Sequence, residues 1–343
     1  MTRDEKFMRR ALELARMGWG TTNPNPMVGA VLVRDDRIIG EGFHRRAGEP
    51  HAEINALRDA AARNNAVDGA TLYVTLEPCS TFGRTPPCTD AIIAAGIARV
   101  VIGAADPNPK HAGRAGQLLR ERGVETVFGV ENAECRELNE HFFRWITSGR
   151  PFVVLKLAMT LDGRIACANG SSRWITGEAA RRRVQHWRQL ADAVMIGGRT
   201  MRTDHPQLTV REPANWWRQP RRIVVSRTAT KEELAKFFPD GRAEAVSLPD
   251  AEAWHDYLKK LGGESVSILL IEGGGELAAA AIAAGAVDFA EFHIAPKLLG
   301  GRDAVPALGG LSPEAMADAL KLRRTKWFLC GEDMIVNGFL REF

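Results

Sequence analysis

Four residues in the first third of the chain could form a zinc centre with a proton shuttle: His51, Glu53, Cys79 and Cys88. One imidazole and two thiolates can hold Zn²⁺, and zinc with an open fourth position lowers the pKa of a bound water to about 7. In deaminases with such a centre, a Glu that is not a ligand carries protons from the water to the leaving amine. His51 and Glu53 are two residues apart, so both can face one bound water. The set predicts a zinc-dependent deaminase.

These residues need a framework that brings them together, and the surrounding sequence predicts one. Residues 2–5 form a capping box before a helix over 3–17, and 34–37 reverse a hairpin between 27–33 and 38–43. Further expected elements are helices over 51–62, 88–95, 112–122 and 131–147, and strands over 70–76, 99–103 and 124–129. The strand over 70–76 would deliver Cys79 to the metal at its end. Alternating strands and helices predict a mixed sheet with helices on both faces.

The chain of 343 residues is long enough for two domains, and Ser148-Gly149-Arg150-Pro151 is the expected boundary. We therefore expect one domain over 1–148 and another over 149–343. A second α/β series follows the boundary. It has strands over 152–158, 193–196, 223–225 and 266–271, helices over 177–190 after a Thr176 cap and over 273–284, and a final hairpin over 327–339.

Composition indicates a soluble globular protein, with 45% hydrophobic and 26% charged residues. No apolar run approaches the roughly 18 residues of a membrane helix, and the first residues lack a signal-peptide core, so we expect a cytoplasmic protein without membrane contact. The odd count of five cysteines favours metal thiolates over a disulfide framework. The net charge of +4 suits a phosphorylated small substrate or weak RNA contact and decides neither.

The segment between the two cysteines is unusually long. Zinc deaminases of this kind usually have Pro-Cys-x-x-Cys, whereas eight residues separate Cys79 from Cys88. A loop held by the metal at both ends would line the mouth of the active site. Arg84 in this loop is a candidate for binding phosphate, because a guanidinium forms paired hydrogen bonds with phosphate oxygens. A solvated loop charge is the alternative.

The motifs of both halves resemble those of the bifunctional deaminase–reductase family of riboflavin biosynthesis. In the first half the resemblance is carried by residues 23–29 (NPNPMVG), 51–53 (HAE), 75–79 (TLEPC), 83–88 (GRTPPC) and 106–109 (DPNP). It implies a cytidine-deaminase-like three-layer α/β/α domain in which His51, Cys79 and Cys88 bind zinc and Glu53 is catalytic. It also implies substrate contacts by Asn25, His44 and Arg84. This chain departs from the family at Thr81, where the family usually has His, which puts a substrate contact there in doubt.

The second half offers a glycine-rich turn, Glu272-Gly273-Gly274-Gly275, between a strand and a helix. Such a turn can let the backbone approach a phosphate at the helix N-terminus, although it can equally be only a tight turn. The spacing is not the dinucleotide fingerprint G-x-G-x-x-G, so a Rossmann domain is not expected.

Residues 156–164, 172–176, 197–200 and 203–211 resemble the family's reductase half, which implies a dihydrofolate-reductase-like α/β domain that uses NADPH. The implied NADPH contacts are Ala158, Trp174, Thr200, Asp204, Gly274, Gly275, Glu276, Leu277, Ala278, Ala279 and Ala280. The implied substrate contacts are Lys156, Ser172, Arg188, Leu208, Arg211 and Glu272, with Arg188 and Arg211 suited to a 5′-phosphate. Hydride transfer to ribose C1′ also needs a proton source, for which Lys156, Asp204 and Glu272 are the titratable candidates.

The resemblance implies deamination of 2,5-diamino-6-(ribosylamino)-4(3H)-pyrimidinone 5′-phosphate followed by reduction of its ribosyl group, in an enzyme that commonly forms homo-oligomers. Two other interpretations stay open at this point. One is a tRNA or nucleoside deaminase with an RNA-binding second domain. We favour no nucleic-acid partner, because the run Arg181-Arg182-Arg183 is more often a solvated helix face than an RNA-binding stripe. The other is a structural zinc, which usually has four protein ligands rather than three.

Overall fold

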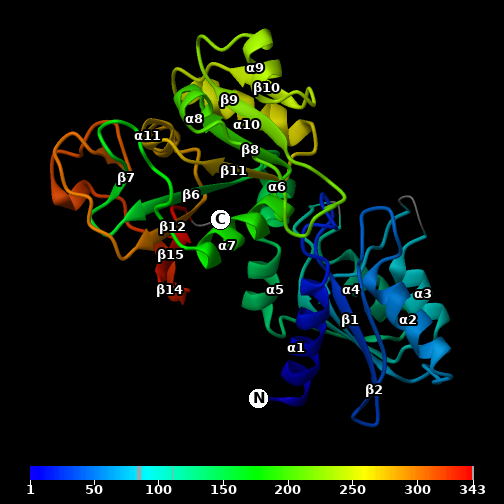
Figure 1. The fold of residues 1–343 in the computed structure, drawn as a ribbon. Coiled ribbons are helices and arrows are strands. Elements are labelled where there is room, and N and C mark those ends of the chain that lie inside the picture. Colours follow the sequence, from blue (N-terminus) through cyan, green and yellow to red (C-terminus); the bar gives the residue numbers. More distant parts are fainter. Residues whose placement is uncertain (83–85, 110, 342–343) are drawn as a thin grey trace. The chain divides into compact units, whose positions relative to one another are not determined.

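The structure is a computed structural model and describes residues 1–82, 86–109 and 111–341. The chain divides into two compact units, Met1–Ser148 and Gly149–Phe343. Figure 1 shows the first unit in blue to teal and the second in green to red. Arg84, one of the expected substrate contacts, lies outside the described residues.

The N-terminal unit alternates strands and helices much as its sequence predicts. In chain order its elements are α1 (Arg3–Arg16), β1 (Gly29–Arg34), β2 (Arg37–Phe43), α2 (Ala52–Ala62), β3 (Thr71–Leu76), α3 (Cys88–Ala94), β4 (Arg99–Ala104), α4 (Arg114–Glu121), β5 (Glu125–Phe128), α5 (Asn132–Leu138) and α6 (Glu140–Ser148).

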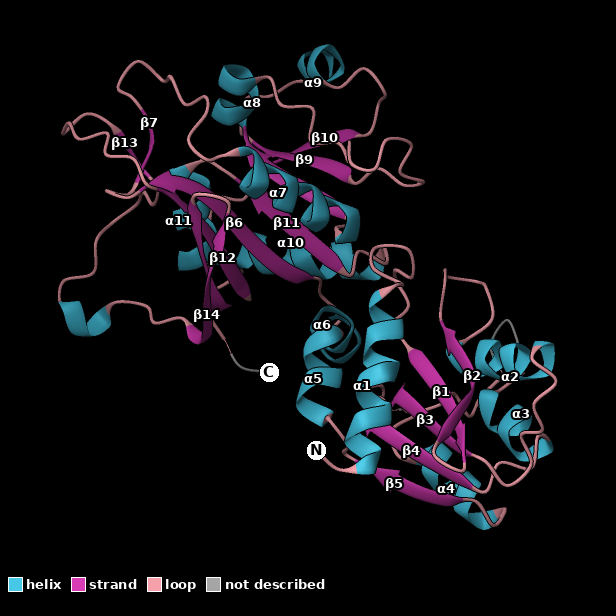
Figure 2. Ribbon diagram, turned by 60° about the horizontal axis from the view of Figure 1, so that its bottom comes forward, coloured by secondary structure: helices cyan, strands magenta, loops and turns pink. Residues whose placement is uncertain are grey.

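These strands form one sheet in the order β2-β1-β3-β4-β5, with β1 antiparallel to both neighbours and β3, β4 and β5 parallel. Successive side chains of a strand point to opposite faces. Val31 and Val33 accordingly join a core with α1, α5 and α6, while Ala30 and Leu32 join a second core with α2, α3 and α4. Figure 2 shows the two helical layers on either side of this sheet. The expected three-layer α/β/α architecture is confirmed.

One long helix expected over 131–147 is instead two, α5 and α6, separated at Asn139. Asn139 is fully buried, and its amide makes two hydrogen bonds with the backbone of Met27, each 2.8 Å long. These bonds anchor the end of the turn that precedes β1. The buried N–H and carbonyl of Met27 need hydrogen-bond partners, and Asn139 supplies them where the helix is interrupted. Apolar periodicity alone could not indicate this interruption.

Two glycines of β2 let α2 lie directly against the sheet. A Cβ on Gly42 would come within 2.3 Å of the backbone nitrogen of Ala56 and 2.5 Å of the carbonyl oxygen of Ala52, and one on Gly40 within 2.5 Å of the carbonyl oxygen of Ala56. Such distances are far inside van der Waals contact. Because α2 begins one residue after His51, this close approach helps to fix the residues at its start.

We expect Gly42→Ala to displace α2 and to destabilise the unit by about 1–3 kcal/mol, the usual cost of overpacking. Urea denaturation and zinc content should both report the change. Gly263→Ala is the matched control, because among the described residues no heavy atom outside its own stretch of helix lies within 4 Å of a Cβ at that position. That control should be neutral or slightly stabilising. Equal stability of the two variants would contradict the proposed close approach.

The C-terminal unit continues the α/β alternation. Its elements are β6 (Phe152–Thr160), β7 (Arg164–Ala166), α7 (Glu178–Leu190), β8 (Ala193–Gly197), α8 (Gly198–Asp204), β9 (Arg221–Val225), α9 (Lys231–Phe237), β10 (Ala243–Val246), α10 (Ala251–Gly263), β11 (Ile268–Glu272), α11 (Gly275–Ala283), β12 (Phe289–Ala295), β13 (Val305–Pro306), the short 3₁₀ helix Met316–Asp318, β14 (Arg323–Cys330) and β15 (Asp333–Phe339).

The main sheet of this unit has the order β10-β9-β8-β11-β6-β12-β15-β14. The strands from β10 to β12 are parallel, and the final hairpin adds two antiparallel strands. One face carries the apolar core, where Leu155 and Ile271 pack with Trp254 of α10 and Leu277 of α11. The alternate residues of the same strands face the opposite way, toward α7 (Figure 2).

Two helix starts differ from the sequence prediction. Thr176 is not the cap of α7. The N-cap is Gly177, whose N–H donates to Asp333 Oδ2 at 2.8 Å, so a carboxylate from the final hairpin replaces the expected side-chain cap. Helix α11 begins at Gly275 rather than Gly273, because Gly273 and Gly274 have φ values of 78° and 84° and belong to the turn. Positive φ is accessible to glycine at little cost.

Candidate active sites

His51, Cys79 and Cys88 lie together in the N-terminal unit, and their ligand atoms are all within 4.8 Å of one another. His51 Nδ1 is 3.5 Å from Cys79 Sγ and 3.3 Å from Cys88 Sγ. Tetrahedral zinc at its usual bond lengths would place such nitrogen and sulfur atoms about 3.6 Å apart. One imidazole and two sulfurs at this spacing fit a zinc ion and leave a fourth position for water or substrate.

Two of these three residues lie at the N-termini of helices. His51 is the N-cap of α2, and Cys88 is the first residue of α3 after Pro87. Neither helix start has a side-chain cap hydrogen bond. Cys79 follows β3, and its Sγ accepts a 3.2 Å hydrogen bond from the Cys88 N–H. The positive end of α3 thus faces the Cys79 sulfur, which favours its thiolate form.

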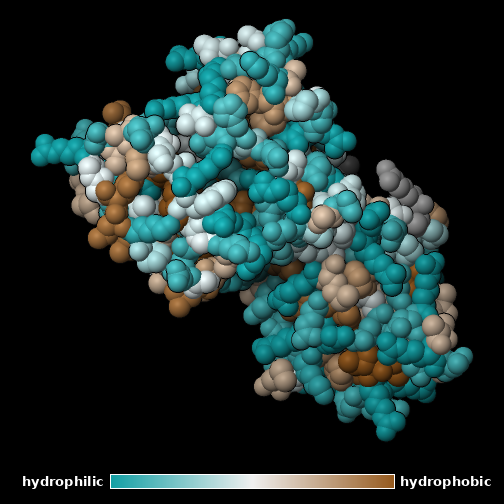
Figure 3. Space-filling model, viewed as in Figure 1, coloured by the Kyte–Doolittle hydropathy of each residue, from teal (hydrophilic) through white to brown (hydrophobic). Residues whose placement is uncertain are grey.

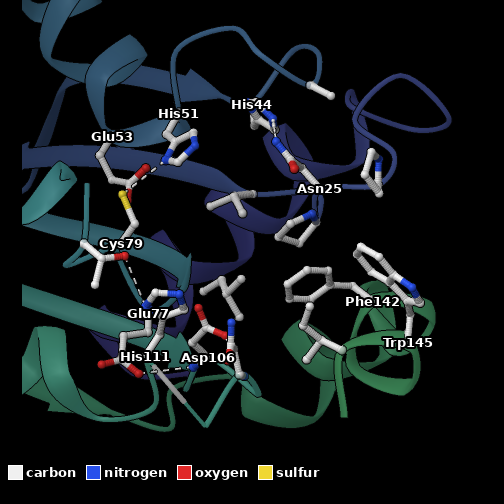
Figure 4. A pocket seen from close by; sticks show the side chains of 18 of the residues that line it. Asn25, His44, His51, Glu53, Glu77, Cys79, Asp106, His111, Phe142 and Trp145 are labelled. Atoms are coloured by element: carbon white, nitrogen blue, oxygen red, sulfur yellow. Dashed lines mark hydrogen bonds between the residues drawn. The ribbon is translucent and has the colours of Figure 1, made fainter. Parts of the chain in front are cut away.

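Glu53 lies in the first turn of α2, and its side chain is directed toward Cys79 (Figure 4). It is only 3% exposed, and burial raises the pKa of its carboxyl. A hydrogen bond with Cys88 lowers the pKa of Cys79 to about 4, whereas the same bond and burial raise that of Cys88. A carboxylate with a raised pKa beside such a pair is suited to accept and return a proton.

A cavity of about 550 Å³ opens beside these residues. Asn25 and His44 form one side of it, and Phe142 and Trp145 of α6 form an aromatic wall (Figure 4). His44 Nε2 is 3.1 Å from Asn25 Nδ2, and His44 Nδ1 is 3.2 Å from the Pro50 carbonyl. Burial lowers the pKa of His44. Five of the expected deaminase residues (Asn25, His44, His51, Glu53 and Cys79) therefore line one cavity.

Several lining residues were not assigned a role from the sequence. Asp106 and His111 lie on the side of the cavity opposite His44 (Figure 4). The Glu77 carboxylate accepts backbone hydrogen bonds from Asp106, Gly113, Ala115 and Gly116, at 2.9 to 3.4 Å, and so anchors the loop that carries both residues. The motif 106–109 signalled this loop, but its sequence did not show which side chains reach the cavity.

In the C-terminal unit, Lys156 and Glu272 are register partners on β6 and β11. Glu291 on β12 is the register partner of Lys156 on its other side. Burial lowers the pKa of Lys156, with the two carboxylates opposing that shift. A lysine between two buried carboxylates is a site for binding or moving a proton, and Ala158 lies two residues further along the same face of β6.

Arg188 of α7 is largely engaged with protein groups. Its Nε and Nη2 donate to the two oxygens of Glu272 at 2.6 and 2.7 Å, and Nη1 donates to the Thr209 carbonyl at 3.1 Å. Although burial of Glu272 would raise its pKa, Arg188 holds that pKa below its usual value. The expected use of Arg188 for a 5′-phosphate would have to compete with this pair. Arg211 is exposed and is better placed for that role.

The run Arg181-Arg182-Arg183 is not a uniform solvated face, and this corrects the sequence interpretation. Arg182 is exposed and pairs with Glu178, but Arg183 donates to both oxygens of the fully buried Glu291, at 2.8 and 2.6 Å. Glu291 also accepts hydrogen bonds from Trp187 and Asn337 and lies 2.9 Å from His293 Nε2. Only the tertiary structure shows that this arginine serves a buried carboxylate.

The glycine-rich turn before α11 lies beside the N-terminus of a second helix, α8. Helices α8 and α11 follow the ends of neighbouring parallel strands, β8 and β11. A Cβ on Gly274 would lie 3.1 Å from Thr200 Oγ1, which is in the first turn of α8. Two helix N-termini at adjacent strand ends favour an anionic group such as a dinucleotide phosphate. Thr200 and Gly274 are therefore neighbours, although they are far apart in sequence.

The other expected reductase residues lie on loops or element ends. Trp174 is 63% exposed, with the Arg181 guanidinium 4.6 Å from its ring centre. Asp204 ends α8, and its carbonyl accepts a hydrogen bond from Arg173, which directly follows Ser172. Leu208 is buried with a φ of 55°, an unusual conformation for this residue type.

Comparison with known proteins identifies relatives of both units. Residues 1–104 match the family model described as cytidine and deoxycytidylate deaminase zinc-binding region, and residues 151–336 match the RibD C-terminal domain. The riboflavin biosynthesis protein RibD of Escherichia coli is 42% identical, over 97% of this chain and 98% of that protein. RibD of Actinobacillus pleuropneumoniae is 41% identical, over 97% of this chain and 94% of that protein.

Two solved structures are similar over nearly the whole chain. RibD of Acinetobacter baumannii has a TM-score of 0.87 and 37% identity, covering 98% of both chains. A Thermotoga maritima protein, described as a diaminohydroxyphosphoribosylaminopyrimidine deaminase/5-amino-6-(5-phosphoribosylamino)uracil reductase, also has a TM-score of 0.87, with 36% identity over 98% of both chains.

Fold and sites together define a zinc-dependent deaminase unit followed by an α/β reductase unit of the dihydrofolate-reductase-like class. The chain belongs to the RibD family of riboflavin biosynthesis proteins. It is a bifunctional deaminase and reductase that uses Zn²⁺ and NADPH. The expected fold class and pair of activities are confirmed.

Proposed function

We propose that His51, Cys79 and Cys88 hold the zinc ion and that Glu53 is the proton shuttle of the deaminase. The observation that carries this assignment is the convergence of one imidazole nitrogen and two sulfurs beside a buried carboxylate at the wall of a cavity. Zinc in that site supplies a hydroxide nucleophile near neutral pH. Glu53 takes the proton released by the water and delivers it to the departing amine.

The substrate that we propose is 2,5-diamino-6-(ribosylamino)-4(3H)-pyrimidinone 5′-phosphate. The cavity volume of about 550 Å³ is within the usual range of small-molecule sites. Phe142 and Trp145 offer a flat apolar wall for a pyrimidine ring, and Asn25 and His44 offer polar groups to orient it. Arg84 remains our candidate for the phosphate. The printed description of the Thermotoga maritima protein supports this substrate class.

For the second step we propose that the glycine-rich turn and α8 bind NADPH, through Ala158, Trp174, Thr200, Asp204 and Gly274 to Ala280. NADPH supplies the hydride for reduction of the ribosyl C1′. Lys156, Ser172, Leu208, Arg211 and the Arg188–Glu272 pair would then face the ribosyl phosphate. Lys156 is the strongest of the three candidates for the proton source, because burial lowers its pKa toward the working range.

Gly274→Ala is expected to raise the KM for NADPH by about tenfold or more. The new methyl would lie 3.1 Å from Thr200 Oγ1, in a backbone conformation with a φ of 84° that Ala adopts at a cost of roughly 1–2 kcal/mol. Steady-state kinetics of reduction with varied NADPH measure the effect. Deamination serves as the internal control and should not change. An unaltered KM for NADPH would remove the turn from the cofactor site.

A two-stage assay on the pyrimidine phosphate tests the proposed function. Without NADPH, the protein should release the amine and accumulate the deaminated phosphoribosyl compound. With NADPH, it should convert that compound to 5-amino-6-(5-phosphoribitylamino)uracil. Deaminated but unreduced product in the presence of NADPH would contradict the reductase assignment, and absence of amine release from zinc-loaded protein would contradict the deaminase assignment.

A homo-oligomer in the cytoplasm remains our expectation. Among the described residues, no helix has both the length and the apolar character to cross a membrane. Strand β14 is a sheet edge on which Trp327 and Leu329 are 65% and 72% exposed. Figure 3 shows hydrophobic residues gathered in this region of the C-terminal unit. An exposed apolar edge strand favours pairing with another chain. Light scattering tests the oligomeric state by comparing the measured mass with the monomer mass of 37.6 kDa.

A further inference from the structure

His111 is a residue of the deaminase cavity to which the proposed function gives no role. It lies in the turn before α4, where its N–H donates to the Asn108 carbonyl at 2.8 Å and its carbonyl accepts from the Arg114 N–H at 3.0 Å. These backbone bonds hold the residue in place. Its side chain lines the cavity on the side opposite His44 and Asn25 (Figure 4).

The His111 ring is oriented by the loop that follows Cys79. His111 Nδ1 lies 3.4 Å from Thr81 Oγ1, and Figure 4 shows this contact as a dashed line reaching the ring. Thr81 is two residues after Cys79, where the resembling family usually carries His. An imidazole from a different segment, 30 residues further along the chain, therefore lies beside the position at which this chain lacks one.

His111 has a ring nitrogen to offer to a ligand. The side-chain contact of its ring among the described residues is that of Nδ1 with Thr81, which leaves Nε2 available. The other imidazoles of the cavity are occupied, because both nitrogens of His44 have protein partners and His51 Nδ1 faces the two sulfurs. The described lining also contains four carboxylates and neither Lys nor Arg. On the described surface of the cavity, His111 is thus the available group that can carry positive charge toward a ligand.

We propose that His111 is a substrate-binding residue of the deaminase, that its Nε2 donates a hydrogen bond to a 5′-phosphate oxygen, and that it takes the place of the imidazole missing at Thr81. Phosphate is the expected acceptor because it is the anionic part of the proposed substrate, and an imidazole is the group of the described lining that can carry positive charge toward it. The Thr81 hydroxyl then positions the ring by its contact with Nδ1. This inference rests on the deaminase function proposed above.

Deamination kinetics of His111→Ala and of Thr81→His/His111→Ala test the inference, with NADPH omitted. A hydrogen bond to a charged group is worth enough for His111→Ala to raise KM about ten- to a hundredfold. The value of kcat should change little, because the zinc ligands and Glu53 remain. The double variant returns an imidazole to the same place and should bring KM back to within about threefold of wild type. His255→Ala, a histidine of α10, is the matched control and should behave as wild type.

Further readouts separate binding from misfolding and from failure of the function itself. Zinc content and reduction of the deaminated compound should match wild type in both variants. On the substrate lacking its phosphate, His111→Ala should have little further effect. An unchanged KM in His111→Ala, an equal loss on both substrates, or a double variant no better than the single one would each overturn the inference. Absence of deamination by wild type would instead refute the proposed function.

Discussion

Glu53→Gln should lower the deamination rate by about 10³-fold, or roughly 4 kcal/mol of activation free energy, while zinc content stays unchanged. The amide preserves the size of the side chain but cannot move a proton between water and amine. Because burial raises the pKa of Glu53, its charged form is costly to keep in the fold. The variant should therefore be at least as stable as wild type. Amine release and metal content measure the two effects.

Glu49→Gln is the matched control for that substitution, since Glu49 is an exposed carboxylate that lines the same cavity. It should retain deamination within a few-fold. Reduction of the already deaminated compound should proceed normally in both variants, because that step uses the other unit. Substantial deamination by Glu53→Gln with full zinc content would assign the proton transfer to another group.

Arg188→Met should destabilise the C-terminal unit by about 3–5 kcal/mol and abolish reduction. It leaves Glu272 buried without the guanidinium that donates two hydrogen bonds of 2.6 and 2.7 Å. Removing one partner of a buried ion pair leaves an uncompensated charge, which is the most costly outcome. Deamination should persist at temperatures at which the C-terminal unit remains folded. Urea denaturation and calorimetry of the full chain measure the loss.

Arg182→Met tests whether the loss of stability expected for Arg188→Met comes from the burial of its ion pair. Arg182 is on the same helix and pairs with Glu178 at 2.6 Å, but these side chains are 55% and 73% exposed. Such a surface pair contributes at most about 1 kcal/mol. The double variant Arg188→Met/Glu272→Leu removes both buried charges and should recover much of the stability without recovering reduction. If Arg188→Met and Arg182→Met unfold at the same urea concentration, the buried pair is not a stabilising element.

Local patterns predicted most of the N-terminal fold, because each element there follows its own apolar periodicity. The hairpin of β1 and β2, helix α2 and strand β3 lie within about two residues of their expected bounds. Elements such as α10 and β12 had no counterpart among the expected ones, and two further misses arose where a distant group changes a local outcome. Asn139 lies between two helices and forms hydrogen bonds with the backbone of Met27, and Asp333 accepts a hydrogen bond from the N–H at the start of α7. No window of neighbouring residues contains either partner.

The two sites show the same limit. The convergence of His51, Cys79 and Cys88 near Glu53 could be predicted, because these residue types at this spacing are what zinc deamination chemistry requires. By contrast, Glu291 and His111 each occur without a local motif. The importance of Glu291 comes from Arg183 and Trp187 of α7 and Asn337 of β15, which two separate elements bring to one carboxylate. His111 reaches the cavity only because the Glu77 carboxylate holds its loop.

The uncapped starts of α2 and α3 have a consequence for protein engineering. Thr2, Thr230 and Asp250 cap α1, α9 and α10 with side-chain hydrogen bonds, whereas His51 and Pro87 make none. A missing cap costs a helix about 1 kcal/mol. A redesign guided by thermostability alone would choose position 51 early and install Ser or Asp there. That gain would come at the expense of an imidazole aimed at two sulfurs, so heat tolerance and turnover compete directly at this residue.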